Sequence, residues 1–445
     1  MKFEDYPIDQ KIKDQLAVLG FRRPTDIQYR AIKHILDGED VMAVAQTGTG
    51  KTAAFVIPVL NKLLKYKKQA SNSVQIRCIV LVPTRELAQQ ITDVFEQIGA
   101  QTKVKVIGLY GGVEQDAQIK QLRVGAEVLI ATPGRMFDLI AQGHLDVSGV
   151  HTLVLDEADL MLDLGFNKDI QDIKRKIPAK HQTLFFTATI DKKIKSLAYD
   201  VVRSAIRIQL SPQNPVSKNV QHAVAFIEMD DKRFFLENMI GEYPEARFLV
   251  FARTKVRVER IVKAMERVGV HAEALHGGVP QNERFGLLEK FREGKNQVLI
   301  TTDVAARGID IPNMEYVINY DLPDNPENYV HRCGRTGRGN ALGQALSFCS
   351  QDEIPLLDAI EAYTGEEVLR YEISEGEYKA ILFDADDPTY NWQKLLDENE
   401  NPDFWEDWHF FCIFTALKFL IYNDEKINAT FCALTWCNGA PPCSN

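Results

Sequence analysis

No stretch of this sequence is apolar for long enough to cross a lipid bilayer. The longest apolar stretch, from Phe410 to Tyr422, is interrupted by Lys418, whereas a membrane-spanning helix needs about 20 apolar residues. The first residues, Met1 to Asp5, lead into polar sequence and not into the apolar core of a secretory signal. We therefore expect a soluble, cytoplasmic protein with no membrane partner.

An excess of positive charge is also missing. The net charge is −10, whereas binding of nucleic-acid phosphates requires Lys and Arg. The deficit is local, because residues 371–445 contain 14 Asp and Glu against 4 Lys, which leaves 48 residues of each sign in residues 1–370. A neutral body of this kind can still bind nucleic acid through a local basic groove with placed contacts, but it should not bind by bulk electrostatics.

Cysteine is scarce in the body of the chain. Only Cys78, Cys333 and Cys349 lie in the first 370 residues, which is too few for a disulfide framework and is typical of a reducing compartment. The other four cysteines lie close to the end of the chain: Cys412, Cys432, Cys437 and Cys443.

What the sequence does contain is an internal repeat. Three short segments recur in the same order at offsets of 168, 166 and 170 residues: Leu81–Arg85 with Leu249–Arg253, Leu109–Val113 with Leu275–Val279, and Val128–Thr132 with Val298–Thr302. Any one match between apolar strands could arise by chance. Three matches at nearly one spacing indicate two copies of one domain of about 170 residues.

The repeated segments predict an α/β fold. Each begins as a short apolar run that ends in polar or glycine residues, and a helical pattern follows, as in Cys78–Val82 before Arg85–Ile98 and Phe248–Phe251 before Val256–Val268. Wholly apolar strands that alternate with helices indicate a parallel sheet covered on both faces. Ligands bind beyond the carboxyl ends of such strands. We predict one domain in residues 1–210, a linker at 211–218, a second domain in residues 219–370 and an irregular tail at 371–445.

A phosphate-binding loop follows the apolar run Val41–Ala45. Its candidate nucleotide-binding residues are Gln46, Thr47, Gly48, Thr49, Gly50, Lys51 and Thr52. Glycines allow backbone N–H groups to approach phosphates, Lys51 supplies a cation to the phosphate oxygens, and the Thr52 hydroxyl is a ligand for Mg²⁺. The usual pattern has glycine where this chain has Ala45, so a simple glycine turn is the alternative.

A pair of acidic residues follows another apolar run, His151–Leu155. Asp156 is placed to hold Mg²⁺ directly or through water, and Glu157 is placed to orient and deprotonate the attacking water. The alternative is an acidic helix N-terminus, which is favourable by itself. The combination with Lys51, 105 residues earlier, favours the catalytic interpretation.

The second copy lacks a phosphate loop but carries arginines beside glycines. Arg335 and Arg338, in the segment His331–Arg338, are candidates to neutralise charge on the transferred phosphoryl group. A solvated basic loop is the alternative. Because Lys51 and Arg335 belong to different copies, the sequence predicts an active site that is completed when the two domains close.

Taken together, these motifs resemble those of the DEAD-box ATP-dependent RNA helicases over roughly residues 1–370. The local sequence of the motifs resembles that of bacterial members. The resemblance implies two tandem RecA-like domains, ATP and Mg²⁺ as cofactors, and RNA, single-stranded or duplex, as the partner. It also implies that Phe21 stacks on adenine, that Gln28 reads the edge of the base, and that Gly308 and Asp310 close over the nucleotide.

The same resemblance implies RNA contacts and a coupling group. The implied RNA contacts are Thr84, Arg85, Gly112, Thr132, Gly134 and Arg135 in the first copy and Arg253, Gly277, Thr302 and Asp303 in the second. Hydroxyls, glycine N–H groups and a few arginines suit a sugar–phosphate backbone. The implied coupling residues are Thr187, Thr189, Asp159 and His331. Thr187 departs from the usual serine and Cys333 from the usual isoleucine.

The tail does not fit the family pattern. All four tryptophans lie after residue 390, among acidic residues, and the last three cysteines do not form a convincing zinc set. An aberrant end and a partner-docking segment both remain open.

The leading functional interpretation is an RNA-stimulated ATPase that separates short duplexes or remodels RNA–protein complexes. An ATP-gated RNA clamp and a DNA helicase of the same superfamily remain as alternatives. Proteins of ribosome assembly or RNA decay are possible partners, and the sequence does not predict the oligomeric state.

Overall fold

The structure, a computed structural model, describes residues 2–46, 48–69, 74–190, 192–210, 216, 219–306, 314–337 and 342–386. All of the expected linker except residue 216, and the tail beyond residue 386, lie outside the described residues. Residues 1–371 form one compact unit and residues 372–445 a second one. The described part of the second unit contains the helix α16 (Glu375–Asp386), so the first part of the tail is helical.

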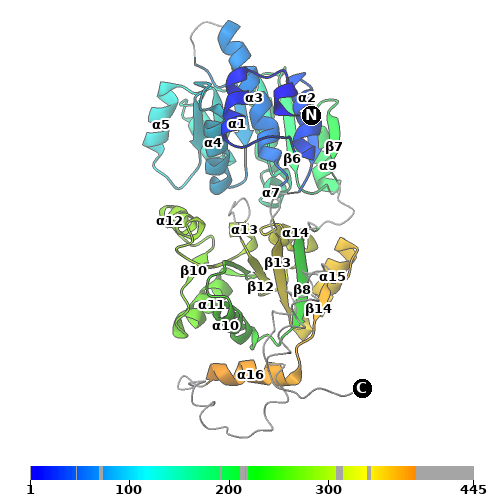
Figure 1. The fold of residues 1–445 in the computed structure, drawn as a ribbon. Helices are drawn as coiled ribbons and strands as arrows, with labels where there is room; N and C mark the ends of the chain where they lie inside the picture. The colour runs from blue at the N-terminus through cyan, green and yellow to red at the C-terminus, as the bar shows by residue number, and fades with distance from the viewer. Residues whose placement is uncertain are drawn as a thin grey trace, which may run out of the picture. The chain divides into compact units, whose positions relative to one another are not determined.

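The first half of the chain contains seven strands, each followed by a helix or preceding one (Figure 1). The elements are η1 (Phe3–Asp5), α1 (Gln10–Val18), α2 (Asp26–Leu36), β1 (Val41–Val44), α3 (Lys51–Gln69), β2 (Cys78–Leu81), α4 (Arg85–Gly99), β3 (Val106–Leu109), α5 (Gln115–Val124), β4 (Val128–Ala131), α6 (Pro133–Ala141), β5 (Thr152–Leu155), α7 (Ala158–Asp163), α8 (Asn167–Lys176), β6 (Gln182–Thr187), α9 (Lys192–Val201) and β7 (Ile206–Gln209).

The second half repeats this arrangement with seven further strands. Its elements are β8 (Val220–Phe226), α10 (Lys232–Glu242), β9 (Phe248–Phe251), α11 (Lys255–Arg267), β10 (Ala272–Leu275), α12 (Gln281–Arg292), β11 (Val298–Thr301), α13 (Asp303–Ala306), β12 (Tyr316–Asn319), α14 (Pro326–Cys333), β13 (Gly343–Cys349), η2 (Gln351–Glu353), α15 (Ile354–Thr364) and β14 (Leu369–Tyr371).

The two sheets have one topology. Their strand orders are β3-β4-β2-β5-β6-β1-β7 and β10-β11-β9-β12-β13-β8-β14, so each strand of the second sheet takes the place of the strand numbered seven lower in the first. The strand pairs in both sheets are parallel. This identity confirms the predicted α/β fold with two tandem copies. The last strand, β14, is short and exposed, and the expected boundary at residue 370 lies within it.

One of the three repeats is out of register by two residues. Strands β3 and β10 match at an offset of 166, and β4 and β11 match at 170, as the sequence predicted. Between β2 and β9 the structural offset is also 170, because Thr84 and Thr254 each cap the helix that follows. Arg253 therefore occupies the place of Pro83, and Lys255 the place of Arg85.

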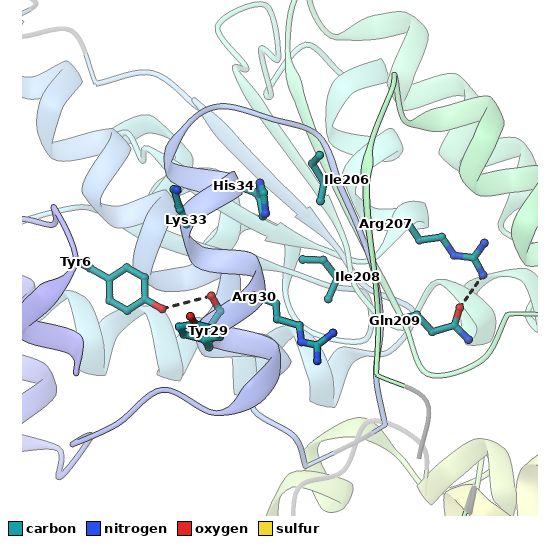
Figure 2. A pocket seen from close by; sticks show the side chains of 9 residues that line it. All are labelled: Tyr6, Tyr29, Arg30, Lys33, His34, Ile206, Arg207, Ile208 and Gln209. Carbon is teal, nitrogen blue, oxygen red and sulfur yellow. Dashed lines mark hydrogen bonds between the residues drawn. The ribbon is translucent and has the colours of Figure 1, made fainter. Parts of the chain in front are cut away.

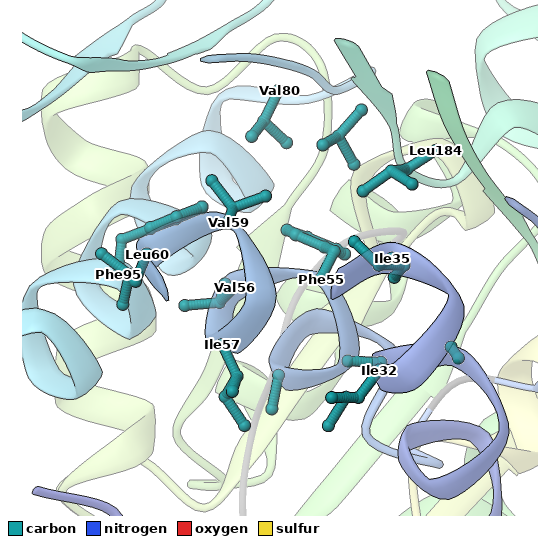
Figure 3. Packing of buried hydrophobic residues seen from close by; sticks show 14 of the residues in the cluster. Ile32, Ile35, Phe55, Val56, Ile57, Val59, Leu60, Val80, Phe95 and Leu184 are labelled. Carbon is teal, nitrogen blue, oxygen red and sulfur yellow. The ribbon is translucent and has the colours of Figure 1, made fainter. Parts of the chain in front are cut away.

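The first sheet is covered on both faces because its strands are apolar on both sides. In β1, Val41 and Ala43 pack with helices α1 to α4, and Met42 and Val44 pack with helices α5 to α9. Figure 3 shows the first of these cores, where Phe55 of α3 lies between α2 and the sheet. The packing leaves the carboxyl ends of the strands for polar residues. Across the described ranges, the structure has no helix that is both long and apolar enough to span a membrane.

Candidate active site

The phosphate loop joins β1 to α3 at the carboxyl edge of the first sheet. The backbone N–H of Ala45 donates to the carbonyl of Thr187 at the end of β6 (3.0 Å), so the loop leaves the sheet beside the coupling segment. The Thr49 hydroxyl donates to the carbonyl of Gln46 (2.7 Å) and closes the loop on itself. Lys51 and Thr52 begin α3. Thr47 lies outside the described residues.

Gln28 connects the start of α2 to the phosphate loop. Its side-chain oxygen accepts from the backbone N–H of Thr25 (3.0 Å) and its amide donates to the carbonyl of Gly50 (3.1 Å). Gly50 has a φ of +91°, and a Cβ there would lie 2.5 Å from the Gln28 amide nitrogen. Glycine is therefore required at position 50 by both its backbone conformation and the close approach of Gln28.

Phe21 lies half-buried at the edge of this region. Its ring meets the ring of the buried Phe3 edge-on, with centroids 6.2 Å apart. This contact with Phe3 restricts the orientation of the Phe21 ring. A ring held in this way suits the expected role of Phe21, which is to stack on a base.

Lys51 meets the acidic pair in the centre of the site. The Lys51 ammonium lies 3.4 Å from a carboxylate oxygen of Glu157, and both side chains are largely buried. Asp156, at the end of β5, is 2% exposed and accepts from the N–H of Glu157 (3.0 Å). Lys51 and Glu157, 106 positions apart, are brought together because β1 and β5 flank β6 in the sheet.

The backbone of Glu157 adopts a left-handed conformation, with φ 51° and ψ 51°. Residues with a Cβ avoid this region at a cost of roughly 1–2 kcal/mol. Glu157 is the residue immediately before α7 and carries the carboxylate that faces Lys51. Strain of this kind concentrates at functional sites, where the surrounding structure enforces it.

Charges in the site shift its pKa values in a way that fits a bound cation. Burial raises the pKa of Asp156 to about 7, against the lowering effect of Lys51. Burial alone would lower the pKa of Lys51, but attraction by Glu157, Asp156 and Asp159 raises it. The buried Asp156 carboxylate thus has less positive charge around it than its ionised form needs, which a divalent cation would supply.

Three of the predicted coupling residues, Asp159, Thr187 and Thr189, form one hydrogen-bonded group. A single oxygen of Asp159 accepts from the backbone N–H groups of Ala188 and Thr189 (3.0 Å each) and from the Thr189 hydroxyl (3.2 Å). The Thr187 hydroxyl donates to the Thr189 carbonyl (3.0 Å). Burial would raise the pKa of Asp159, but the charges of His331 and Lys51 and its backbone hydrogen bonds lower it. The pKa of Asp159 is therefore lowered in part by His331, a residue of the second half.

In the second half, α14 leads into the predicted arginines. Arg335 follows α14 and is 8% exposed. Arg332, which the sequence did not single out, is fully buried and pairs bidentately with Asp303 (2.6 and 2.8 Å). This pair engages both oxygens of Asp303, an expected RNA contact, within the protein. Arg338, Gly308 and Asp310 lie outside the described residues.

The expected RNA contacts of the first half lie where β2, β3 and β4 end. Thr84 caps α4 and Thr132 precedes α6. Arg135 donates to Gln118 (2.6 Å) and to the carbonyl of Val113 (3.2 Å). Gly112 has a φ of +79°, and a Cβ there would lie 2.1 Å from the Arg85 guanidinium. Gly134 is exposed at the start of α6. The structure thus brings these residues to one region of the sheet edge.

The expected RNA contacts of the second half are less uniform. Gly277 is exposed and Thr302 half-buried, each just beyond a strand. Arg253 donates to Glu353 (3.0 Å) and to the carbonyl of Leu322 (3.2 Å), and pairs with Asp324 (3.3 Å). Glu353 in turn pairs with the buried Lys232. Arg253 is therefore held by its own half of the chain.

A buried cluster between α4 and α12 was missed by the sequence analysis. Glu86 accepts from Arg284 (2.8 Å) and Gln281 (3.2 Å), and Gln281 also accepts from Arg85 (3.0 Å). Tyr110 and Phe285 lie beside it, with centroids 6.1 Å apart. Gln281 and Arg284 are three residues apart and so share a helix face, which was the available signal. The cluster connects an expected RNA contact, Arg85, to the second half.

Comparison with known proteins agrees with this geometry. The family described as DEAD/DEAH box helicase matches residues 25–197, and the family described as helicase conserved C-terminal domain matches residues 231–340. The ATP-dependent RNA helicase RhlB of Shewanella sp. strain ANA-3 is 38% identical over 390 residues, which are 87% of this chain and 88% of RhlB. The chain belongs to the DEAD-box ATP-dependent RNA helicase family.

Solved structures of DEAD-box proteins have the same fold. Dbp5 of S. cerevisiae, bound to RNA and ADP BeF3, is 30% identical with a TM-score of 0.77, and the match covers 86% of this chain and 98% of that one. The DEAD-box helicase Mss116, bound to ssRNA and UDP-BeF, is 28% identical with a TM-score of 0.77, covering 89% and 84%. The two tandem parallel sheets of this chain are those of the family.

Proposed function

We propose that this DEAD-box protein hydrolyses ATP in response to RNA and uses domain closure to separate short RNA duplexes or to remodel RNA–protein complexes. The observation that carries this proposal is the meeting of Lys51 with Glu157, 3.4 Å apart, over the buried Asp156. A cation, a candidate general base and a candidate metal ligand come after β1 and β5, the two strands that flank β6 in the sheet. The named relatives act on or bind RNA, which supports RNA as the partner.

Different residues of the first half bind the base, the phosphates and the metal ion of the nucleotide. Phe21 and Gln28 hold the base. The N–H groups of Gln46 to Gly50, with Lys51, hold the phosphates, and Thr52 and Asp156 hold Mg²⁺. Bound Mg²⁺ neutralises phosphate charge during transfer. Glu157 orients the attacking water and accepts its proton.

The residues of the second half complete the site. Arg335 and Arg338 stabilise the charge that develops on the transferred group, an effect of about 10³–10⁵ in rate, while Gly308 and Asp310 close over the nucleotide. RNA bound by Thr84, Arg85, Gly112, Thr132, Gly134 and Arg135, and by Arg253, Gly277, Thr302 and Asp303, favours closure. Thr187, Thr189, Asp159 and His331 couple hydrolysis to strand separation.

The division of labour follows the proposed domains, with residues 1–210 as the ATP-binding domain, 211–218 as the linker, 219–370 as the helicase C-terminal domain and 371–445 as the tail. We assign the activity to the bacterial cytoplasm, in keeping with the Shewanella relatives. Proteins of ribosome assembly or RNA decay are the partners we propose for it.

The test compares the wild-type chain with Glu157→Gln in ATP hydrolysis and in separation of a short RNA duplex. Wild type should hydrolyse ATP faster with RNA and separate the strands. Glu157→Gln should bind RNA with ATP but hydrolyse about 10²–10⁴-fold more slowly. Glu96→Gln makes the same change on the exposed surface of α4 and should leave both activities unchanged. Binding without strand separation by wild type would indicate a clamp, and equal stimulation by DNA would indicate a DNA helicase.

A further inference from the structure

A hollow whose lining includes none of the candidate nucleotide-binding residues lies between α2 and the edge strand β7. Its volume is about 610 Å³. Figure 2 shows the residues that line it: Tyr29, Arg30, Lys33 and His34 come from α2, and Ile206 to Gln209 come from β7. Gln28, on the same helix, is buried against the phosphate loop, so this hollow is formed by the residues of α2 that the nucleotide site does not use.

The hollow is basic in an acidic chain. Arg30, Lys33 and Arg207 are exposed and His34 is half-exposed, and among the described residues that line it none is acidic. Outside the lining, the carboxylate of Glu39 pairs with His34 (2.6 Å). In Figure 2, Arg30 points from α2 toward β7. Residues 1–370 as a whole are neutral, so this local excess of positive charge favours an acidic ligand.

The wall opposite α2 is a sheet edge. β7 is the last strand of its sheet and pairs with β1. The N–H groups of Ile206 and Leu210 donate to Asp40 and Val44 on the β1 side (2.8 and 2.9 Å). Because the N–H and C=O of one residue point to the same side of a strand and those of the next residue to the opposite side, the N–H and C=O of Arg207 face away from β1. An edge of this kind is a template for pairing with a further strand.

The side chains of β7 select what can pair with it. Ile208 is buried and Ile206 half-buried on the face toward α2, whereas Arg207 is exposed on the other face. A charged residue on an edge strand discourages unselected pairing, but directly opposite an acidic residue it becomes favourable. Tyr29, 55% exposed, adds an aromatic surface beside the hollow.

We propose that the hollow between α2 and β7 binds an acidic, extended peptide segment of a partner protein, which adds to β7 as a further strand. Its backbone pairs with the outer edge of β7 near Arg207. Its acidic side chains meet Arg30 and Lys33 on one face and Arg207 on the other. This is strand addition, in which backbone hydrogen bonds give affinity and alternate side chains give specificity.

RNA fits this surface less well than a peptide. The RNA contacts proposed above follow β2, β3 and β4, whereas β7 lies at the opposite end of the seven-stranded sheet from β3. Six strand spacings place the two ends about 29 Å apart. A sugar–phosphate backbone also lacks the alternating N–H and C=O groups that pair with a strand edge.

The test measures binding of a fluorescein-labelled ten-residue peptide that alternates aspartate with valine to the full chain, by fluorescence anisotropy. Saturable binding is expected. The matching peptide with asparagine in place of aspartate should bind about tenfold more weakly, and so should the variant Arg30→Glu/Lys33→Glu. The control variant Arg260→Glu/Lys263→Glu reverses two exposed charges at the same spacing on α11 and should bind the peptide like wild type.

Two substitutions of one residue test the backbone pairing. Arg207→Gln removes the charge and keeps the N–H, whereas Arg207→Pro removes both without touching the bonds to β1, which an edge position tolerates. Proline should bind the peptide about fivefold more weakly than glutamine. Both variants should retain the RNA-stimulated ATPase of wild type, which shows that they are folded.

Three results would overturn the proposal: no saturable binding of the aspartate peptide, equal binding of the asparagine peptide, or equal effects of proline and glutamine at position 207. If instead Arg30→Glu/Lys33→Glu weakens binding of a labelled RNA oligonucleotide while the peptide does not bind, the hollow is an RNA surface.

Discussion

The left-handed backbone of Glu157 predicts that, of two substitutions that both remove activity, the one to glycine leaves the protein more stable than the one to alanine. Glu157→Gly and Glu157→Ala both delete the carboxylate, so the loss of its contact with Lys51 is the same in both. They differ in the Cβ, which at φ 51° and ψ 51° costs roughly 1–2 kcal/mol. Glycine loses roughly 0.5–1 kcal/mol more chain entropy on folding than alanine. Glu157→Gly should therefore be the more stable of the two by about 1 kcal/mol.

The matched control is an exposed glutamate with ordinary helical geometry. At Glu289 in α12, glycine should be less stable than alanine by roughly 0.8–1.0 kcal/mol. The sign of the difference thus reverses between the two positions. Thermal unfolding of the nucleotide-free chain measures it, with an expected separation of about 2–4 °C at each position. If glycine is no more stable than alanine at position 157, the strain assigned to Glu157 is wrong.

Three further predictions concern the same machinery. Gly50→Ala should raise the KM for ATP at least about tenfold, since the new Cβ displaces the Gln28 amide that lies 2.5 Å away, and an unchanged KM would contradict that packing. Burial raises the pKa of Asp156 to about 7, so below pH 7 the free site holds a proton that Mg²⁺ must displace. Calorimetry in two buffers should show proton release on Mg-ATP binding at pH 6.5 and none at pH 9, and Asp156→Asn should remove the difference. Arg284→Ala leaves Glu86 without its 2.8 Å partner and should raise the RNA concentration needed for half-maximal ATPase by about tenfold or more, with ATP binding unchanged. Equal RNA dependence of variant and wild type would mean that this cluster does not support closure.

Much of the fold could be predicted because its strands are buried on both faces. The runs Val41–Ala45 and His151–Leu155 contain β1 and β5, since a strand in a covered parallel sheet must be apolar on both sides. The strand β14 was not predicted, because Leu369–Tyr371 is three residues long and largely exposed, so it leaves no apolar run to detect.

Parts of the site could not be predicted because they depend on backbone conformation and tertiary packing, and not on residue type. The conformation of Glu157 follows from how β5 enters α7. The sequence offered several arginines near Gly334, and only packing places Arg332 in the core against Asp303. The match of Arg85 with Arg253 shows a related limit. The sequence comparison aligned similar residue types in these two segments at an offset of 168. The threonine caps Thr84 and Thr254 define an offset two residues larger.

The most direct test of the shared active site is the rate of ATP hydrolysis by Arg335→Lys in the presence of saturating RNA. Arg335 belongs to the second half and Lys51 to the first, so hydrolysis should fall about 10³–10⁵-fold while ATP binding and ATP-dependent RNA binding persist. Hydrolysis at the wild-type rate would contradict the role of Arg335 in a site completed by domain closure.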